Sequence, residues 1–447
     1  MPPPADEIDI PLFDMVLCFS RAIDFLHPKI SEHHLRVAYV ASCLAEELGL
    51  DREETQNVLI AGALHDVAAV SCVTRLHSFE DALAYYHDSS PQFSDDLHQH
   101  GREGYLLLRD FTPFAEAAQV IRFHHVNWDF GRGSAFQGAP VPLSSHILRL
   151  ADRVAVLPND EQNILSQVAD IRATVIAGAA SLFKPEVVSA FESISEKESF
   201  WLDLTNRHKE AILKKRFGAP KVRLHLDGLH QLSRIFGKII DYRSPFTATH
   251  SSGVAAISEE LATRLGMPTP HRRLIGVAGY LHDIGKLAVP TTLLNKQGKL
   301  TPEEMAIVRQ HPYYTHQILS MVPGLETVNT WASLHHERLD GTGYPFRTRD
   351  IPLGARIVAV ADIFTAITEN RPYRAGMERA QCLAVLDQLV SEGAIDGDVV
   401  AVLRGDFEEI HHIRSRSQQA FAPTIFAARQ YALQSEDGSR TVAQCRR

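Results

Sequence analysis

The chain contains two copies of one sequence pattern, and this duplication constrains its fold more than any other feature. The segment HHLRVAYVASCLAEELGL, which begins at His33, aligns with HSSGVAAISEELATRLGM, which begins at His250, 217 residues later. The same spacing places AGALHDVAAV over AGYLHDIGKL without a gap, so the histidine-aspartate pairs of the two copies coincide. We therefore predict two similar modules, because two copies are fewer than the three or more repeats that a solenoid needs.

Histidines and aspartates recur at matching positions further along both copies. The spacing between the copies shrinks only from 217 to 210 residues, where PLSSHILRLADRVAVL matches PLGARIVAVADIFTAI. The matched residues of the first copy are His33, His65, Asp66, His100, His124, His125 and Asp152. Their counterparts in the second copy are His250, His282, Asp283, His311, His335, His336 and Asp362. Packing alone does not explain an ordered set that occurs twice, and the set indicates a metal site.

Apolar residues repeat every three to four positions in almost every segment, as in VAYVASCLAEELGL and VAAISEELATRLGM. This period is typical of amphipathic helices, and alternating runs typical of strands are scarce. We predict an all-α protein with two tandem helical domains, at residues 14–205 and 228–435, since 447 residues are too many for one typical core. The charged stretch at residues 206–227 is predicted to be the linker.

Charge and composition argue against several classes of protein. A net charge of −9 argues against a duplex nucleic acid partner, because such binding needs a basic face. No run of about 18 apolar residues suggests a membrane span, and the start MPPPADEIDI lacks the features of a secretory signal. The five cysteines show no CxxC pairing, so neither a disulfide framework nor a zinc-thiolate site is indicated. We expect a cytoplasmic protein without a membrane partner.

The seven matched residues of the second copy offer only imidazole and carboxylate ligands. Such a set suits iron or manganese better than a structural zinc ion. Seven side chains are too many for one ion but suit two, with one carboxylate bridging them. Most of them lie in apolar segments such as LIGVAGYLHDIGKL, where an unpaired charge is costly. We therefore predict two divalent metal ions, iron or manganese, in the C-terminal domain.

The second copy also resembles a known enzyme family. The strings LHDIGK, HHERLDGTGYP, VAVADIF and RPYR, with the HP dipeptide at residues 311–312, together resemble the HD-GYP family of cyclic dinucleotide phosphodiesterases. This family is a branch of the HD metal-dependent phosphohydrolases. The match covers residues 228–400, and the first copy is similar to the general HD fold without the GYP loop. The resemblance implies tandem HD-type domains and hydrolysis of a 3′–5′ cyclic dinucleotide, cyclic di-GMP or cyclic GMP-AMP, to a linear product.

The resemblance also assigns roles to individual residues. It implies that one ion is held by His250, His282, Asp283 and Asp362, and that the other is held by His311, His335 and His336, with Asp283 bridging both. A hydroxide between the two cations would attack the phosphate, because metals lower the pKa of water. Lys286, one turn beyond Asp283, would hold a phosphate oxygen, so Asp283 and Lys286 are the predicted catalytic residues. Arg371 and Arg374 would bind the second phosphate, and Tyr344 would contact a base or pack the loop.

The two copies differ around their shared ligands. The first has Ala69 where the second has Lys286, and NWDFGRGSAF replaces the GTGYP loop. Two alternatives follow for the first copy: a second metal site with altered or lost phosphodiesterase activity, or a metal-free regulatory or dimerisation module. The second copy has Phe246 where some family members have a glutamate that supports a third metal, so two ions are expected there.

Two further functions stay open on the sequence alone. One is a nucleotide phosphomonoesterase of the broader HD class, which the GYP and RPYR strings disfavour. The other is a cyclic dinucleotide receptor with a regulatory output, which the intact ligand set and Lys286 disfavour. The sequence does not decide between the two cyclic dinucleotides, or whether the chain forms a homodimer or binds a signalling protein.

Overall fold

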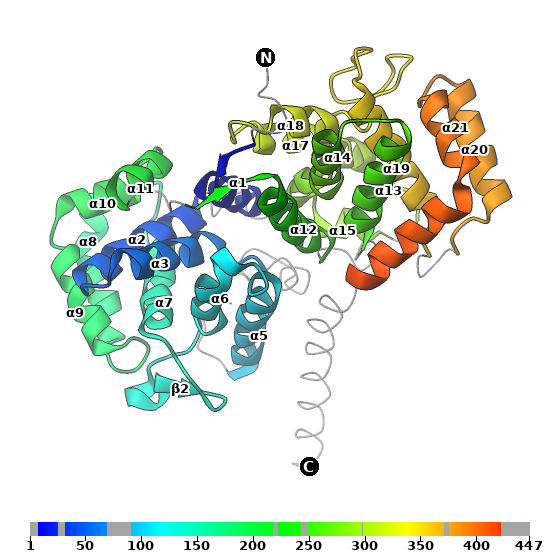
Figure 1. Cartoon of the computed structure of the whole chain (residues 1–447). Coiled ribbons are helices and arrows are strands. Elements are labelled where there is room, and N and C mark those ends of the chain that lie inside the picture. Colours follow the sequence, from blue (N-terminus) through cyan, green and yellow to red (C-terminus); the bar gives the residue numbers. More distant parts are fainter. Residues whose placement is uncertain are drawn as a thin grey trace, which may run out of the picture. The chain divides into compact units, whose positions relative to one another are not determined.

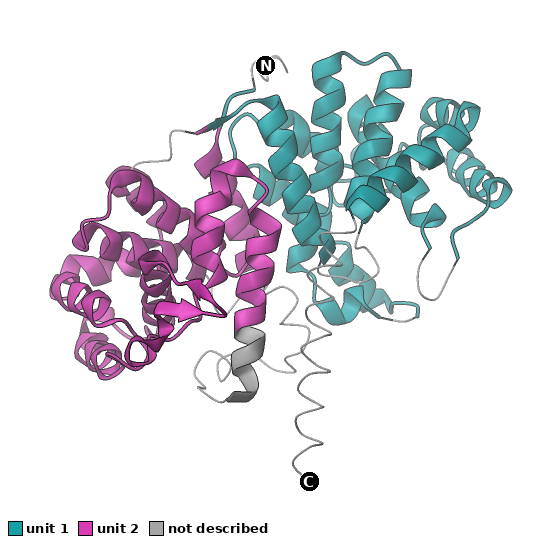
Figure 2. Ribbon diagram, turned by 60° about the horizontal axis from the view of Figure 1, so that its bottom comes forward, with its two compact units in different colours: residues 1–10, 223–427 teal, residues 11–222, 428–447 magenta. Residues whose placement is uncertain are grey.

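The computed structural model describes residues 8–25, 32–68, 91–217, 222–242, 249–296, 298–370 and 375–421. The regular elements of this part of the chain are helices, apart from a few two-residue strands (Figure 1), which confirms the predicted all-α class. The chain divides into two compact units (Figure 2). Of the described residues, those from 11 to 222 form one, here called the N-terminal unit, and those from 8 to 10 and from 223 to 421 form the other, here called the C-terminal unit.

In the N-terminal unit, α2 packs on α3 and α7, and α5 packs on α6. The helices are α1 (Leu12–Asp24), α2 (His33–Glu47), α3 (Arg52–Leu64), α5 (Pro91–Leu108), α6 (Ala115–Arg122), α7 (Leu143–Val156), α8 (Ile164–Ala177), α9 (Pro185–Ile194), α10 (Glu198–Leu204) and α11 (Lys209–Phe217). The unit also has the 3-10 helices η5 (Thr112–Phe114) and η6 (Asp129–Ser134), and an antiparallel pair of strands, β2 (Ala135–Phe136) and β3 (Ala139–Pro140).

The C-terminal unit repeats this packing, with α13 on α14 and α19, and α17 on α18. The helices are α12 (Leu226–Tyr242), α13 (His250–Arg264), α14 (Thr269–Leu281), η7 (Ile284–Ala288), α15 (Thr291–Leu294), α16 (Pro302–Val308), α17 (His311–Leu319), α18 (Glu326–Ser333), α19 (Leu353–Thr368), α20 (Arg379–Ser391) and α21 (Gly397–Gly405). Residues 407–421 are also helical. The strands β1 (Ile10–Pro11) and β4 (Arg223–Leu224) pair in a two-stranded sheet.

Both histidine-aspartate pairs lie directly after the last residue of a helix, α3 in one unit and α14 in the other. The start of α3 is fixed by a capping box, in which Asp51 accepts from the Glu54 N–H at 2.9 Å and Glu54 accepts from the Asp51 N–H at 3.0 Å. Such a box satisfies two backbone donors that a helix leaves unpaired. Within a helix, neighbouring side chains point about 100° apart, so the turn after the helix lets both members of a pair face one site.

A glycine sets the distance between the first two ligand-bearing helices of each unit. A Cβ atom on Gly62 of α3 would lie 2.6 Å from the Cα of Ala38 on α2. In the other unit, a Cβ on Gly279 of α14 would lie 2.6 Å from the Cα of Ala255 on α13. Since any side chain would force these backbones apart, the close approach depends on glycine at both positions.

The stretch predicted as the linker is only partly a connector. Residues 209–217 form α11, in which Leu213 and Phe217 are buried and Lys209 forms an ion pair with Glu32 at 2.5 Å. Two apolar residues four positions apart are enough to dock this charged helix, and so sparse a pattern did not stand out in the sequence. The predicted end of the second domain, residue 435, lies outside the described residues.

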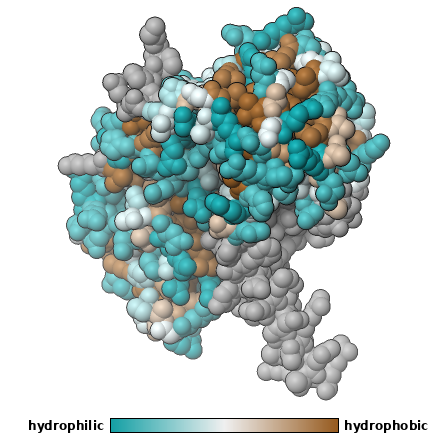
Figure 3. Space-filling model, turned by 45° about the vertical axis from the view of Figure 1, so that its right-hand side comes forward, coloured by the Kyte–Doolittle hydropathy of each residue, from teal (hydrophilic) through white to brown (hydrophobic). Residues whose placement is uncertain are grey.

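Hydrophilic and hydrophobic residues are interspersed on the face shown in Figure 3, and the hydrophilic ones cover the larger part of it. None of the helices in the described part of the chain is both long and apolar enough to cross a membrane.

We expect Gly279→Ala to lower the melting temperature of the full chain by several degrees, because the added Cβ would meet the Ala255 backbone at 2.6 Å. Overpacking of this kind costs about 1–3 kcal/mol. Differential scanning calorimetry would measure the shift. Gly405→Ala is the matched control, since a Cβ on Gly405 has nothing within 4 Å. Equal melting temperatures for the two variants would contradict the proposed constraint.

Candidate metal centre

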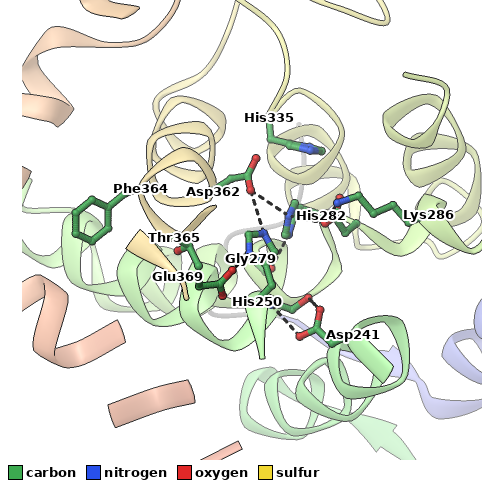
Figure 4. A network of polar contacts seen from close by, with 12 residues as sticks. Asp241, His250, Gly279, His282, Lys286, His335, Asp362, Phe364, Thr365 and Glu369 are labelled. Carbon is green, nitrogen blue, oxygen red and sulfur yellow. Dashed lines mark hydrogen bonds and ion pairs between the residues drawn. The ribbon is translucent and has the colours of Figure 1, made fainter. Parts of the chain in front are cut away.

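The structure brings the seven predicted ligands of the C-terminal unit together. They come from the starts of α13 and α17, from the turns after α14 and α18, and from α19. In Figure 4, dashed lines join Asp362 to His250 and His282, and Lys286 lies beside them. Three overlapping groups have their ligand atoms within 4.8 Å of one another: His250, His282 and Asp283; His282, His335 and Asp362; and His311, His335 and His336. The predicted set therefore forms one continuous cluster.

Asp283 turns one carboxylate oxygen toward each part of this cluster. Its Oδ2 atom lies 3.2 Å from Nε2 of His282, and its Oδ1 atom lies 3.3 Å from Nε2 of His311. A carboxylate placed in this way can bridge two metal ions.

Hydrogen bonds to the backbone fix the orientation of three ligand histidines. Their Nδ1 atoms lie 2.6–2.8 Å from backbone carbonyl oxygens, in the pairs His282 with Gly279, His311 with Val308, and His335 with Ala332. A carbonyl oxygen can only accept, so Nδ1 carries the hydrogen and Nε2 of the neutral ring presents a lone pair. The Nε2 atoms of His311 and His335 nevertheless lie 3.3 Å apart. Two lone pairs at this distance repel, whereas ligands about 2.0–2.2 Å from a shared metal ion are separated by about that distance.

The electrostatics of the cluster favour the protonation states that bind metals. Burial lowers the pKa of His311 to about 3 and that of His336 to about 4. Burial alone would raise the pKa of Asp283, but His282 and Lys286 hold it well below its usual range. Neutral imidazoles and ionised carboxylates are the metal-binding forms of these groups.

His250 differs from the other ligand histidines. Burial alone would lower its pKa, but the carboxylates of Glu369 and Asp362 raise it to about 10. A metal ion at His250 would therefore displace a proton, and its apparent affinity should fall as the pH decreases below about 10.

The sequence did not reveal Glu369, whose Oε2 accepts a hydrogen bond from Nδ1 of His250 at 3.3 Å. A carboxylate in this position orients a ligand histidine and raises its basicity. Glu369 directly follows the last residue of α19 and lies seven residues, about two helical turns, after the ligand Asp362, so both lie toward the same side of that helix. That spacing is the signal that could have identified it.

The predicted substrate residues are only partly described. Nζ of Lys286 lies 2.5 Å from Oδ2 of Asp283, and its side chain is 26% exposed. The ring of Tyr344 lies 4.9 Å from that of His336, and the Arg309 guanidinium lies 4.4 Å from the Tyr344 ring centre. The sequence had not singled out Arg309. Arg371 and Arg374 lie outside the described residues, as do Phe246 and Ala69.

Two carboxylates of the HHERLDGTGYP segment hold its loop in place. Glu337 accepts hydrogen bonds from the backbone N–H groups of Phe346 at 2.7 Å and Arg347 at 3.1 Å. Asp340 accepts one from the Thr342 N–H at 2.8 Å. Through these contacts both carboxylates stabilise the turn that follows the two histidines.

The N-terminal unit assembles its seven matched residues in the same way. Asp66 belongs to two candidate groups, one with His33 and His65 and the other with His100, His124 and His125. Its Oδ2 lies 3.3 Å from Nε2 of His65, and its Oδ1 lies 3.2 Å from Nε2 of His100. Asp152 completes the set, with Oδ1 3.3 Å from Nε2 of His33. The division of the Asp66 oxygens matches that of Asp283.

In the N-terminal unit, the Nε2 lone pair of one ligand histidine also faces a second ligand histidine. Nδ1 of His124 lies 2.6 Å from the carbonyl oxygen of Ile121, and its Nε2 lies 3.2 Å from Nε2 of His100. This cluster is more enclosed, since the side chain of Asp152 is 1% exposed whereas that of Asp362 is 14% exposed. Both clusters could hold metal, and they differ in the exposure of one aspartate.

Comparison with known families gives two matches, both to models described as an HD domain. One covers residues 30–157 and the other covers residues 234–399. These ranges contain all seven matched residues of the first and second copy, respectively.

Several characterised proteins are similar to this chain. The 3′3′-cGAMP-specific phosphodiesterase 1 of Vibrio cholerae is 31% identical over 417 residues, which cover 91% of this chain and 94% of that protein. The 3′3′-cGAMP-specific phosphodiesterase 3 of the same organism is 27% identical over 441 residues, which cover 88% of this chain and 94% of that protein. The cyclic di-GMP phosphodiesterase PA4108 of Pseudomonas aeruginosa is 45% identical, but over only 141 residues, which cover 31% of this chain and 34% of that protein.

One solved structure matches both units of the chain. It is the crystal structure of the Vibrio cholerae cyclic GMP-AMP phosphodiesterase V-cGAP3, with a TM-score of 0.61 and 25% sequence identity. The match covers 90% of this chain and 98% of that chain.

We expect Asp283→Asn to weaken metal binding in the C-terminal unit by more than tenfold, because the amide keeps the shape of the bridging carboxylate but removes its charge. Even the hydrogen-bond partners of metal ligands contribute about 10–100-fold to affinity. Inductively coupled plasma mass spectrometry of the full chain, reconstituted with manganese, would measure the metal bound per chain.

The exposed Asp350→Asn is the matched control and should keep the metal content of the unchanged protein. The same measurement on Asp66→Asn tests the N-terminal cluster, and the losses in the two aspartate variants should add in the double variant. A wild-type metal content in Asp283→Asn would show that Asp283 does not bridge.

Proposed function

The chain belongs to the HD-GYP family of cyclic dinucleotide phosphodiesterases, and we propose that its substrate is 3′3′-cGAMP. The observation that carries this proposal is the extent of the similarity. The two Vibrio cholerae enzymes named as specific for 3′3′-cGAMP match this chain across both units, whereas the matching cyclic di-GMP phosphodiesterase PA4108 covers about a third of it. The family relationship also favours the phosphodiesterase over a phosphomonoesterase or a receptor.

The metal is proposed to be iron or manganese, bound as a pair in the C-terminal unit. Seven imidazole and carboxylate ligands, with no thiolate among them, support this choice. When bound, two divalent cations would activate a water molecule and neutralise charge on the phosphate. Asp283 and Asp362 would hold the ions, and Glu369 would keep His250 correctly oriented.

Lys286 is proposed to hold a non-bridging oxygen of the scissile phosphate. Burial alone would lower the pKa of Lys286, but Asp283 raises it, so the ammonium group stays charged at neutral pH. Its side chain is 26% exposed although it pairs with Asp283, so it can reach a bound substrate. A fixed positive charge beside the phosphate stabilises the charge that develops in the transition state.

Residues around the half-buried His336 are proposed to contact the rest of the substrate. Tyr344 lies beside the His336 ring, and the exposed Arg309 covers the Tyr344 ring. This aromatic and cationic surface suits a nucleobase or a second phosphate. On the family resemblance, Arg371 and Arg374 are proposed to bind that second phosphate.

We also propose that the N-terminal unit binds a pair of metal ions. The observation that favours this second site over a metal-free module is that Asp66 takes part in two groups of ligands, as a bridging carboxylate does. The loss of metal expected in Asp66→Asn tests this proposal.

We expect the manganese- or iron-loaded full chain to hydrolyse 3′3′-cGAMP with a kcat/KM at least about tenfold above that for cyclic di-GMP, a difference of about 1.4 kcal/mol. Liquid chromatography with mass spectrometry would identify the linear products. Asp283→Asn is the control for hydrolysis at the proposed site. A preference for cyclic di-GMP would contradict the proposed substrate, and cleavage of neither would contradict the proposed activity.

We expect Lys286→Gln to lower kcat/KM for the cyclic dinucleotide by about 10²–10³-fold, the range measured when one transition-state donor is removed. Its metal content should stay at the wild-type level, which separates loss of the phosphate contact from loss of the metal. The exposed Lys299→Gln serves as the matched control. Wild-type turnover in Lys286→Gln would exclude the proposed role.

A further inference from the structure

The N-terminal unit has two arginines beside its candidate metal ligands that the C-terminal unit lacks. Arg149 and Arg153 lie one turn apart on α7, three residues before and one residue after the ligand Asp152. At the matching positions 210 residues later, α19 has Ala359 and Ile363. Two otherwise similar sites thus differ in the positive charge around them.

Neither arginine is neutralised by a carboxylate in direct contact. Nε and Nη2 of Arg149 both donate to Oδ1 of Asn127, at 3.2 and 3.0 Å. An arginine has five N–H donors, so three of them remain. For these three, and for Arg153, the described residues provide no hydrogen-bond or ion-pair partner. The Asn127 contact therefore positions a guanidinium group that still has free donors.

Both guanidinium groups act on the metal ligands. The charge of Arg149 lowers the pKa of His125, in addition to the larger effects of burial and of the neighbouring histidines. Burial lowers the pKa of Arg149 to about 10, so the group stays charged at neutral pH. Asp152 partly offsets the lowering of the pKa of Arg153 by burial. The contact of Arg149 with Asn127, two residues after the ligand His125, places its charge beside the ligand cluster, and Arg153 directly follows the ligand Asp152 on α7.

The charges around the two clusters point to an anion in the N-terminal one. Among the described residues, the carboxylates matched in the N-terminal set are Asp66 and Asp152, and two arginines lie beside them. The C-terminal unit has a third carboxylate, Glu369, at the position that matches Asn159. Two divalent ions and two arginines would outweigh the two aspartates of the N-terminal site, and a bound anion would offset this excess of positive charge.

We propose that the N-terminal unit binds a phosphate group between its metal ions and the pair Arg149 and Arg153. This inference rests on the metal pair proposed for that unit. Guanidinium groups match the geometry of phosphate oxygens, which they bind through two N–H groups at once. The Asp152 side chain is 1% exposed, so the ligand that we infer is a small one, inorganic phosphate or a terminal phosphate group. The arginines would supply the positive charge that Lys286 gives in the other unit.

The competing explanation is that the arginines balance Asp66 and Asp152 in a site that holds no metal. The two explanations differ in what they predict for phosphate. Two arginines that only balance the two carboxylates leave no net positive charge to attract an anion. Metal ions and arginines together leave a net positive charge, which a bound anion would balance. Because binding of the anion and of the metal would be linked, phosphate should also raise the apparent metal affinity of the N-terminal unit.

Isothermal titration calorimetry of inorganic phosphate into the manganese-loaded full chain would test the proposal. The experiment uses the Asp283→Asn variant, in which the C-terminal site is disabled. We expect phosphate to bind, and Arg149→Gln with Arg153→Gln to weaken that binding at least tenfold. Arg52→Gln is the matched control, because Arg52 begins α3 and lies about 20 Å along the helix from the His65 end. Circular dichroism would verify that each variant is folded.

The outcomes separate this inference from the metal proposal. Absence of phosphate binding, or binding that the double arginine variant leaves unchanged, overturns the inference even where Asp66→Asn loses metal. If Asp66→Asn loses no metal, the proposed N-terminal metal pair fails, and so does a phosphate site built on it. Arginine-dependent binding that also disappears in Asp66→Asn supports both.

Discussion

The hydrogen bonds that hold Nδ1 of the ligand histidines to backbone carbonyl oxygens are the interactions on which both sites depend. They fix the tautomer of rings such as His282 and His335, and thereby direct their Nε2 lone pairs inward. Without a cation, the Nε2 lone pairs of His311 and His335 would face one another at 3.3 Å in a buried space. The backbone therefore orients these histidine side chains for metal binding in the metal-free protein. The repulsion between the buried lone pairs is unfavourable, and a bound cation relieves it.

The helix packing serves the same end. Gly279 lets α14 approach α13 closely, and its carbonyl oxygen accepts the hydrogen bond from His282. Gly62 does both for α3 and His65 in the other unit. One residue in each copy thus sets a helix distance and orients a ligand. This coupling gives a physical reason why the two copies agree around these glycines while their loops differ.

The sequence predicted both ligand sets because the duplication shows which polar residues recur in order. It could not show that Asp66 and Asp283 divide their oxygens between two groups, since that depends on how distant helices pack. It missed Glu369 and the arginines of α7 for the opposite reason. A comparison of the copies selects what they share, whereas Glu369 matches Asn159 and Arg149 matches Ala359. It also missed α11, whose docking depends on only two buried apolar side chains.

Residues that differ between the copies lie one layer outside the ligands, and this is where two sites of common origin can acquire different chemistry. The ligands cannot change without loss of the metal, but a charge beside them can move from one element to another. In the C-terminal unit the charge is on Lys286 of η7, directly after the bridging Asp283, and it remains partly exposed. In the N-terminal unit it lies on α7, around an aspartate that is almost fully buried. On the two proposals, the more exposed site with its lysine would receive the cyclic diester, and the less exposed site with its two arginines would bind a small anion.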